Sequence, residues 1–315
     1  MDSVWWDVGR WGVAVLLASY IGASGLKKKS LNKSGAIAGF AVGLVSLGLS
    51  LRLGLTLILF YKSSSILTRV GIDDKARLTD DYKASRERSR SPPTASMVQV
   101  LSCSLFATGL ALAHRFLTGV GDSLVDCGSQ PVGGALLCAY LGFYACCAGD
   151  TWSSELGVLS RTPARLITNL SRIVPPGTNG GVTPAGTLAS VAAGLTMGIG
   201  FVVFGWIFRL SPPTPESSAE ASAHTPFFSQ LPLVFLGALS GFVGSILDSL
   251  MGAVFQASYF DTNRQMIVDR PSPSAFRKGD LLLVSGWNIL SNEQVNVLSA
   301  VLTSVLAGLV GPFLL

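Results

Sequence analysis

Two aspartates stand where an acidic side chain is suited to chemistry. Asp150 lies in the segment GDTWSSELG (149–157), directly after an uncharged apolar run, and Asp248 lies inside the apolar segment GSILDSLMG (244–252). Acids within membrane segments are rare and usually mark a functional site. Two plainer interpretations stay open, because Asp150 can cap a helix and Asp248 can be a hydrogen-bonded structural acid. We take both as candidate catalytic residues.

The same segments offer oxygen ligands for a hard metal ion. At helical spacing Asp150, Ser153 and Ser154 share one face, which makes an oxygen-rich cluster at the end of the apolar run. Mg²⁺ prefers carboxylate oxygens and keeps several of its waters. We therefore expect Asp150, Glu155 and Asp248 to hold Mg²⁺.

Other polar groups are suited to phosphate. The segment KKKS (27–30) supplies lysines as mobile point charges, and the glycines of GTNGGVT (177–183) permit the positive φ of an anion-binding nest. This loop lacks the GK[ST] ending of a P-loop. The residues expected to bind a nucleotide cofactor are Lys28, Lys29, Ser34, Ser64, Ser65, Thr151, Ser154, Thr178, Asn179, Gly180, Gly181, Thr183 and Asn296.

Each of these groups also has a structural interpretation. The lysines can anchor the chain to anionic lipid, and serines at a membrane boundary can bond back to their own helix. The glycine loop can be a simple turn. Ser34 can cap a following helix, Asn292 or Glu293 can cap the last one, and Asn296 can hydrogen-bond between helices.

The composition excludes most soluble folds. Of the 315 residues 49% are hydrophobic and only 13% charged, and the mean hydropathy is +0.51. A soluble domain is typically about 25% charged, so disorder, a coiled coil and an ordinary soluble enzyme are excluded. The five cysteines form no CxxC pair, which disfavours a zinc site or a disulfide framework. We expect an all-α, polytopic membrane bundle that forms one domain over residues 1–315.

Hydropathy predicts about eight spans. The apolar segments cover residues 11–26, 35–51, 53–67, 96–118, 131–149, 182–208, 228–256 and 294–315. The third is the weakest, because Arg52 and Lys62 flank a short apolar run, and seven spans result if it is re-entrant. Two segments rich in Pro and Ser, 84–95 and 211–226, are expected to be flexible inserts.

Positive charge predicts the orientation. With eight spans, the connections 27–34, 62–95, 150–181 and 257–293 face one side and hold 19 of the 23 lysines and arginines. Basic residues favour the cytosolic side, so both termini are expected on the non-cytosolic side. The first segment carries Asp2 and Asp7 before its apolar run and Lys27 after it, which is typical of an uncleaved anchor rather than a signal peptide.

Seven sequence blocks together resemble one known family. They are KKKSLNKSGA (27–36), SSSILT (63–68), ACCAGDTWSSELGVLS (145–160), the segment around Arg165, GTNGGVTPAG (177–186), GSILDSLMGA (244–253) and the segment 292–296. In this order they are similar to the transmembrane protein 19 family, also called the domain-of-unknown-function 92 membrane family, with the plant PGR-type members as the nearest group. The likeness covers nearly the whole chain.

The resemblance implies a polytopic membrane protein and suggests a reaction. One branch of the family includes a plastid phytyl-phosphate kinase, and the Gly-Asp-Thr block is similar to one in CTP-dependent polyprenol kinases. By that likeness Asp150 would hold metal, Thr151, Ser154 and Glu155 would support it, and residues 178–181 would hold nucleotide phosphates. The segment 292–296 reads NEQVN where many members carry consecutive Asp and Asn residues, which weakens a metal role there.

Three functions stay open at this point. The first is transfer of a phosphoryl group from a CTP-like nucleotide, with Mg²⁺, to an isoprenoid or phytyl monophosphate at the cytosolic face of a lipid bilayer. The second is a non-catalytic membrane regulator of the response to glucose, and the third is a transporter. No plastid transit leader is recognisable, so the plasma membrane or the endoplasmic reticulum is expected rather than the plastid. No nucleic-acid partner is expected.

Overall fold

The computed structural model describes residues 2–78, 95–119, 121–208, 227–268, 276 and 280–315. The two inserts expected to be flexible lie outside these residues, apart from Ala95. Within the described part the chain is mostly helical, and four helices are long and apolar enough to cross a membrane: Pro131–Gly157, Pro184–Phe208, Phe228–Phe255 and Asn292–Phe313. The helix Lys33–Leu49 is apolar but shorter.

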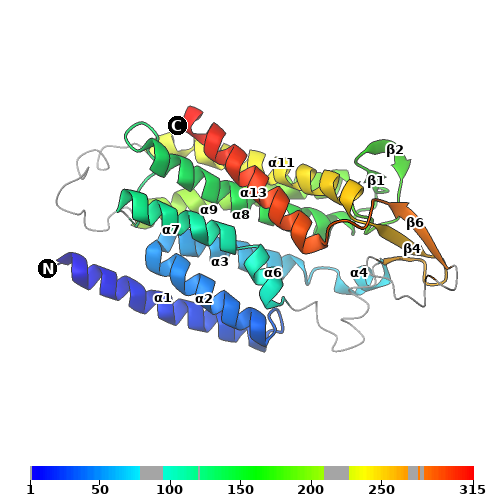
Figure 1. The fold of residues 1–315 in the computed structure, drawn as a ribbon, viewed down its shortest axis with the longest axis horizontal. Helices are drawn as coiled ribbons and strands as arrows, with labels where there is room; N and C mark the ends of the chain where they lie inside the picture. The colour runs from blue at the N-terminus through cyan, green and yellow to red at the C-terminus, as the bar shows by residue number, and fades with distance from the viewer. Residues whose placement is uncertain (1, 79–94, 120, 209–226, 269–275, 277–279) are drawn as a thin grey trace.

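The helices follow the expected apolar segments closely. They are α1 (Asp2–Lys27), α2 (Lys33–Leu49), α3 (Leu51–Leu67), α4 (Ile72–Leu78), α6 (Met97–Ser102), α7 (Leu105–Thr118), α8 (Pro131–Gly157), α9 (Pro184–Phe208), α11 (Pro232–Phe255) and α13 (Asn292–Val310). Two short 3₁₀ turns accompany them: η1 (Phe227–Gln230) precedes α11, and η2 (Gly311–Phe313) follows α13. The long helices run side by side, and both chain termini lie at the same end of the bundle (Figure 1).

Within the described residues, six short strands depart from the all-α prediction. Strands β1 (Arg165–Leu166), β2 (Asn169–Ile173) and β3 (Gly181–Val182) form an antiparallel sheet in the order β2-β1-β3. Strands β4 (Ser258–Asp261), β5 (Met266–Val268) and β6 (Leu281–Ser285) form a second one in the order β5-β4-β6. Both sheets lie at the end of the bundle opposite the termini (Figure 1). The connections between α8 and α9 and between α11 and α13 therefore contain strands where only loops were expected.

Helix α8 is the centre of the bundle. It packs against α9, α11 and α13, and its residues from Leu137 to Gly149 are buried without a break. Glycines bring its neighbours close: a Cβ on Gly149 would lie 2.4 Å from the carbonyl oxygen of Gly241 on α11, and one on Gly194 would lie 2.2 Å from that of Gly237. Small residues at such crossings let membrane helices approach backbone to backbone. These glycines therefore fix how far α11 lies from α8 and α9.

A buried carboxylate holds the start of α3. Asp122 accepts hydrogen bonds from the Ser50 hydroxyl at 2.6 Å, from the Arg52 N–H at 3.0 Å and from the Leu51 N–H at 3.2 Å. The first N–H groups of a helix lack partners within the helix, so this side chain caps α3 from a distant segment. The Arg52 guanidinium lies over the Phe201 ring of α9, 3.9 Å from its centroid. The segment 53–67 is thus one continuous helix tied into the bundle.

Two predicted boundaries are corrected. The single helix expected over 96–118 is broken between α6 and α7, where Ser104 leaves helical geometry and its hydroxyl donates to the Val100 carbonyl at 2.6 Å. Such a bond competes with the regular helix pattern. In the other direction, α8 continues eight residues past the expected end at 149, so Asp150 lies inside a helix and does not cap one.

Candidate functional site

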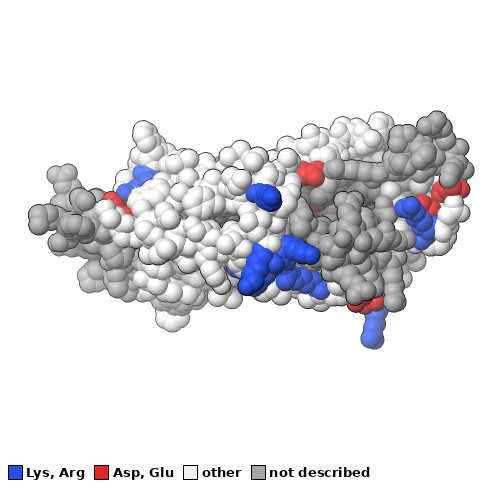
Figure 2. Space-filling view, turned by 90° about the horizontal axis from the view of Figure 1, so that it is seen from below, with Lys and Arg blue, Asp and Glu red and all other residues white. Residues whose placement is uncertain are grey.

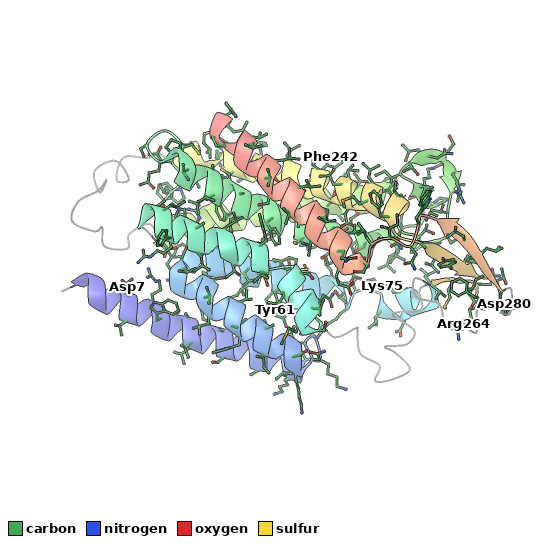
Figure 3. All side chains as sticks on the ribbon, in the orientation of Figure 1. Asp7, Tyr61, Lys75, Phe242, Arg264 and Asp280 are labelled. Carbon is green, nitrogen blue, oxygen red and sulfur yellow. The ribbon has the colours of Figure 1, made fainter. Side chains whose placement is uncertain are left out.

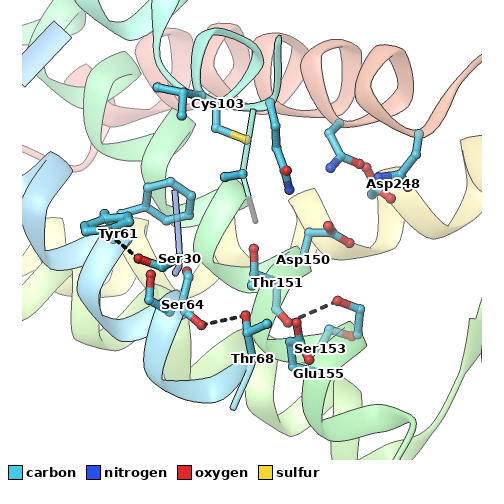
Figure 4. Close-up of a pocket in the computed structure, with 18 of the residues that line it drawn as sticks. Ser30, Tyr61, Ser64, Thr68, Cys103, Asp150, Thr151, Ser153, Glu155 and Asp248 are labelled. Atoms are coloured by element: carbon cyan, nitrogen blue, oxygen red, sulfur yellow. Dashed lines mark hydrogen bonds between the residues drawn. The ribbon is translucent and has the colours of Figure 1, made fainter. Parts of the chain in front are cut away.

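One cavity of about 550 Å³ opens among α1, α2, α3, α8 and α11. Its polar end is lined by the last turns of α8, by the loop 176–181 and by the facing turns of α11 and α13. A second part, the apolar arm, is lined by Ala18, Ile21 and Gly22 of α1, Gly39, Val42, Gly43 and Leu47 of α2, and Leu57 and Ile58 of α3. Tyr61 and Ser64 of α3, and Thr68 directly after it, lie beside the polar end (Figure 4). The cavity is therefore amphipathic along its length.

The two candidate catalytic aspartates meet at the polar end. Asp150 comes from α8 and Asp248 from α11, and their carboxyl groups lie close enough to interact electrostatically. Figure 4 shows the Asp150 side chain pointing across the cavity toward Asp248. Gly149 directly precedes Asp150 and faces Gly241, and Gly244, one turn before Asp248, faces Cys146 of α8, so the close helix crossing brings the carboxylates together.

Helix α13 supplies the neighbours of Asp248. The Ser299 hydroxyl donates to Asp248 Oδ2 at 2.9 Å. With its amide nitrogen turned toward α11, Asn296 donates to the same oxygen at 3.2 Å and to the Asn292 carbonyl at 3.0 Å. Asn296 thus forms the interhelical bond that the sequence suggested. Ser291, with Gln294 in a capping box, caps α13, so the expectation that Asn292 or Glu293 does so is wrong.

Most of the residues predicted for the site line this one cavity. Helices α3 and α8, the glycine loop, α11 and α13 all contribute, from positions far apart in the sequence. The predicted residues that line it are Ser64, Ser65, Asp150, Thr151, Ser154, Glu155, Thr178, Asn179, Gly180, Gly181, Thr183, Asp248 and Asn296. Lys28, Lys29 and Ser34 do not line it.

The three outlying residues have other surroundings. Lys28 and Lys29 are exposed beside the connection between α1 and α2, and Figure 2 shows lysine and arginine side chains gathered on that face of the molecule. The Ser34 hydroxyl donates to Asn32 Oδ1 at 2.8 Å, and Asn32, which also accepts the Gly35 N–H, is the residue that caps α2. The predicted capping role of Ser34 at α2 is therefore wrong, because α2 begins at Lys33, two residues earlier than that role requires.

The glycine loop does not form the predicted anion-binding nest. Gly177 and Gly180 do adopt positive φ, at 86° and 77°. However, the N–H of Thr178 donates to the Pro175 carbonyl, that of Gly181 to the Thr178 carbonyl at 2.8 Å, and that of Asn179 to the Ser258 hydroxyl at 2.9 Å. With these donors used internally, the loop forms a wall of the cavity and joins the first sheet to the second.

The hydroxyls of Thr178 and Thr183 are also engaged. Thr178 Oγ1 donates to the Pro175 carbonyl at 2.7 Å, and Thr183 Oγ1 accepts the Gly186 N–H at 3.1 Å at the start of α9. In α8, Thr151 Oγ1 donates to the Cys147 carbonyl at 2.8 Å and Ser154 Oγ to the Thr151 carbonyl at 3.1 Å. Oxygen lone pairs of these hydroxyls remain as acceptors toward the cavity.

Glu155 has a partner that sequence reasoning missed. Lys75 of α4 is fully buried, and its Nζ donates to Glu155 Oε2 at 2.5 Å and to the Leu67 carbonyl at 3.0 Å. Figure 3 places Lys75 at the α4 end of the bundle. Among the described residues no group of three or more His, Cys, Asp or Glu gathers to hold a metal ion. The structure thus brings together two of the three predicted metal ligands and pairs the third with a cation.

Arg69 is the second residue that was missed. Of the described lysines and arginines it is the one that lines the cavity, and its Nη2 donates to the Lys28 carbonyl at 2.7 Å. Both Arg69 and Lys75 lie in the basic connection that follows α3, where the sequence shows only a general excess of positive charge. Which basic residues of this connection reach the cavity or Glu155 depends on how α4 packs against the bundle, and no local sequence pattern indicates that.

Comparison with known proteins identifies the family. The family model described as integral membrane protein DUF92 matches residues 16–304. Protein PGR of Arabidopsis thaliana is 40% identical over 301 residues, which cover 96% of both chains. An uncharacterized membrane protein of Methanocaldococcus jannaschii is 24% identical over 299 residues, 95% of this chain and 93% of its own. No solved structure matches significantly. The chain belongs to the DUF92 family of integral membrane proteins.

Proposed function

We propose that this protein is a membrane phosphotransferase that passes a phosphoryl group from a CTP-like nucleoside triphosphate to an isoprenoid monophosphate. The observation that carries the proposal is the form of the cavity, in which a pair of carboxylates at a polar end is continuous with an apolar arm between helices. Its volume of about 550 Å³ is within the usual range of roughly 300–1,000 Å³ for small-molecule sites. An acceptor with a charged head and an apolar tail matches both ends.

The proposed orientation places the polar end at the cytosolic face. The described parts of the basic connections between α1 and α2, α8 and α9, and α11 and α13 lie away from the two termini (Figure 1). Such an excess of positive charge is typical of cytosolic loops. We propose eight spans with both termini on the other side, in the plasma membrane or the endoplasmic reticulum.

The aspartate pair fits a divalent cation. Two ionised carboxylates that face each other in one cavity repel each other, and a cation bound between them relieves that repulsion. Mg²⁺ is commonly held by one or two carboxylates together with substrate phosphates, and therefore does not need the third acid, Glu155. In this proposal Asp150 and Asp248 hold Mg²⁺, which when bound would neutralise charge on the donor phosphates.

The remaining residues position the reactants. Phosphoryl transfer needs in-line placement and charge stabilisation rather than a strong base. An oxygen of the acceptor monophosphate bonds to the terminal phosphorus of the donor while the bond to the bridging oxygen breaks, giving an isoprenoid diphosphate and a nucleoside diphosphate. Ser299 and Asn296 fix the Asp248 carboxylate, and Arg69 supplies positive charge at the cavity.

A transfer assay with defined reactants tests the proposal. Purified full-length protein is incubated with Mg²⁺, a panel of nucleoside triphosphates and geranylgeranyl, farnesyl or phytyl monophosphate, beside Asp150→Asn. We expect an isoprenoid diphosphate product that the substitution abolishes, with the variant still folded because Asn relieves the repulsion from Asp248. Turnover retained in Asp150→Asn would refute the role of that residue, and no turnover with any pair of reactants would refute the kinase proposal.

Transport is the second candidate function. The N–H groups of Thr178, Asn179 and Gly181 are used within the protein, and Lys28 and Lys29 lie outside the cavity, so fewer phosphate-binding donors reach it than the sequence suggested. A transporter would use Asp248 and need no nucleotide, so flux of a solute that is lost in Asp248→Asn favours it. If neither turnover nor flux is found and Asp150→Asn still complements a null strain, the non-catalytic regulator of the glucose response is favoured.

A further inference from the structure

The apolar arm is bounded by two glycines, Gly39 and Gly43, where an added Cβ would meet no clash. A Cβ on Gly39 would find its nearest neighbour, Leu31 Cδ1, at 3.8 Å, and one on Gly43 would find Ala18 Cβ at 3.6 Å. Both distances are ordinary contacts. By contrast, a Cβ on Gly48 would lie 2.2 Å from the Trp11 ring, and one on Gly54 would lie 2.4 Å from Leu47. Gly48 and Gly54 are therefore glycines for packing, whereas Gly39 and Gly43 leave room in the cavity.

The arm has a definite length. On α2 its lining runs from Gly39 to Leu47, about 12 Å at the rise of an α-helix. Leu47 is fully buried and packs with Ala14 and Leu51 in an apolar cluster at the deep end. The arm is thus a slot of limited depth between α1, α2 and α3 rather than an open surface.

An unpartnered hydroxyl lies where the arm meets the polar end. Ser64 is 9% exposed, its Oγ has no hydrogen-bond partner within the described residues, and it lines the cavity (Figure 4). A buried hydroxyl without a partner is unfavourable, and a ligand that supplies an acceptor or a donor removes that cost. Nearby, Tyr61 is already paired with Ser30 at 2.6 Å. Ser64 therefore marks the level at which the polar head of a bound molecule begins.

We propose that the apolar arm binds one hydrocarbon chain of the acceptor lipid, with its head group at Ser64, and that Gly39 and Gly43 set the longest chain that fits. This inference rests on the proposed function for the identity of the head group, because the carboxylate pair lies beyond Ser64. The chemical class of the ligand is a single-chain lipid monophosphate. A side chain larger than Ala at position 43 would block the arm between Ser64 and the deep end at Leu47, so that only shorter hydrocarbon chains fit.

Photolabelling in nanodiscs tests the chain site without depending on turnover. The probes are geranyl, farnesyl and geranylgeranyl monophosphates with a diazirine at the end of the chain, and labelled residues are located by mass spectrometry. We expect the longest probe to label the deep end around Leu47 in the unmodified protein. In Gly43→Leu that labelling falls about tenfold, the effect of leaving two methylenes unburied, while geranyl labelling is unchanged.

A matched control separates filling of the slot from a change in helix stability. Gly109 on α7 is exposed, and a Cβ placed on it would have no neighbour within 4 Å. Gly109→Leu therefore adds the same side chain to a helix outside the cavity. We expect this variant to keep the labelling pattern of all three probes.

The outcomes distinguish the two proposals. Deep labelling that depends on chain length, but without phosphoryl transfer, keeps the chain site and removes the kinase proposal. Labelling of the unmodified protein outside α1, α2 and α3, or equal loss for all three probes in a folded Gly43→Leu, overturns the chain site. Should Gly43→Leu fail to fold, Gly39→Val and the labelling map of the unmodified protein decide the question.

Discussion

The crossing of α8 and α11 makes the sharpest prediction, because it links the fold to the carboxylate pair. A Cβ on Gly149 would lie 2.4 Å from the Gly241 carbonyl oxygen and 2.8 Å from the Gly241 Cα, both backbone atoms that cannot rotate away. Gly149→Ala must therefore push the helices apart. Overpacking of this kind costs about 1–3 kcal/mol, against a gain of up to about 1 kcal/mol from replacing glycine in a helix.

The control variant, Gly109→Ala, should change the free energy of unfolding in the opposite direction. Gly109 has open space at its Cβ, so Gly109→Ala gains the helix term alone and should be stabilising by up to about 1 kcal/mol. Unfolding of both variants in the same detergent, followed by circular dichroism, measures the difference, which should be about 1–3 kcal/mol. Because the crossing also brings Asp150 to Asp248, Gly149→Ala should lower the rate of any reaction that uses the pair even under conditions where the variant is fully folded. A Gly149→Ala protein as stable as Gly109→Ala would refute the reasoning.

Three further predictions follow from polar side chains and their partners. Lys75→Met leaves Glu155 without its cation and should lower the free energy of unfolding by about 3 kcal/mol. Adding Glu155→Gln should recover most of that loss. A double variant that stays as unstable as Lys75→Met contradicts the pairing. Asp122→Ala removes the cap of α3 and should cost about 1–2 kcal/mol, whereas Asp122→Asn should cost less, as thermal unfolding would show. Hydrogen bonds from the Ser129 hydroxyl and N–H lower the pKa of Asp126 below its usual value. The ionised side chain therefore stabilises the fold above the unfolded-state pKa, and this stabilisation is lost as the pH falls through the lowered folded-state pKa. The melting temperature of Asp126→Asn should then converge with that of the unmodified protein in acid.

The helices, and the two aspartates as candidates, could be predicted from sequence. Long apolar runs impose helices in a membrane, since a helix satisfies its own backbone, and most boundaries of α8, α9, α11 and α13 were placed to within a few residues. An acid inside such a run, such as Asp248, must face the interior, which made it a candidate for function. That Asp150 lies beside it could not be predicted, because the meeting depends on the helix crossing.

What was missed depends on partners far away in the chain. The strands pair Arg165 with Val182 and Ser258 with Ser285, and the strands are too short to leave an alternating pattern. Lys75 reaches Glu155 across 80 positions, which no local spacing encodes. The glycine loop has the positive φ that its composition predicts, but the N–H of Asn179 donates to the Ser258 hydroxyl, and those of Thr178 and Gly181 donate to carbonyls of the loop itself. Local composition thus predicted the backbone conformation of the loop, but not which acceptors its backbone N–H groups would bond.

A double-mutant cycle on the carboxylate pair tests the central claim most directly. The rate of diphosphate formation is measured for Asp150→Asn, Asp248→Asn and the double variant, with Asp126→Asn as the same change at a position that does not line the cavity. If the two carboxylates hold one metal ion, each single change should lower the rate about a thousandfold and the double change should lower it no further. Independent, multiplicative losses, or a rate that survives either single change, would contradict the account.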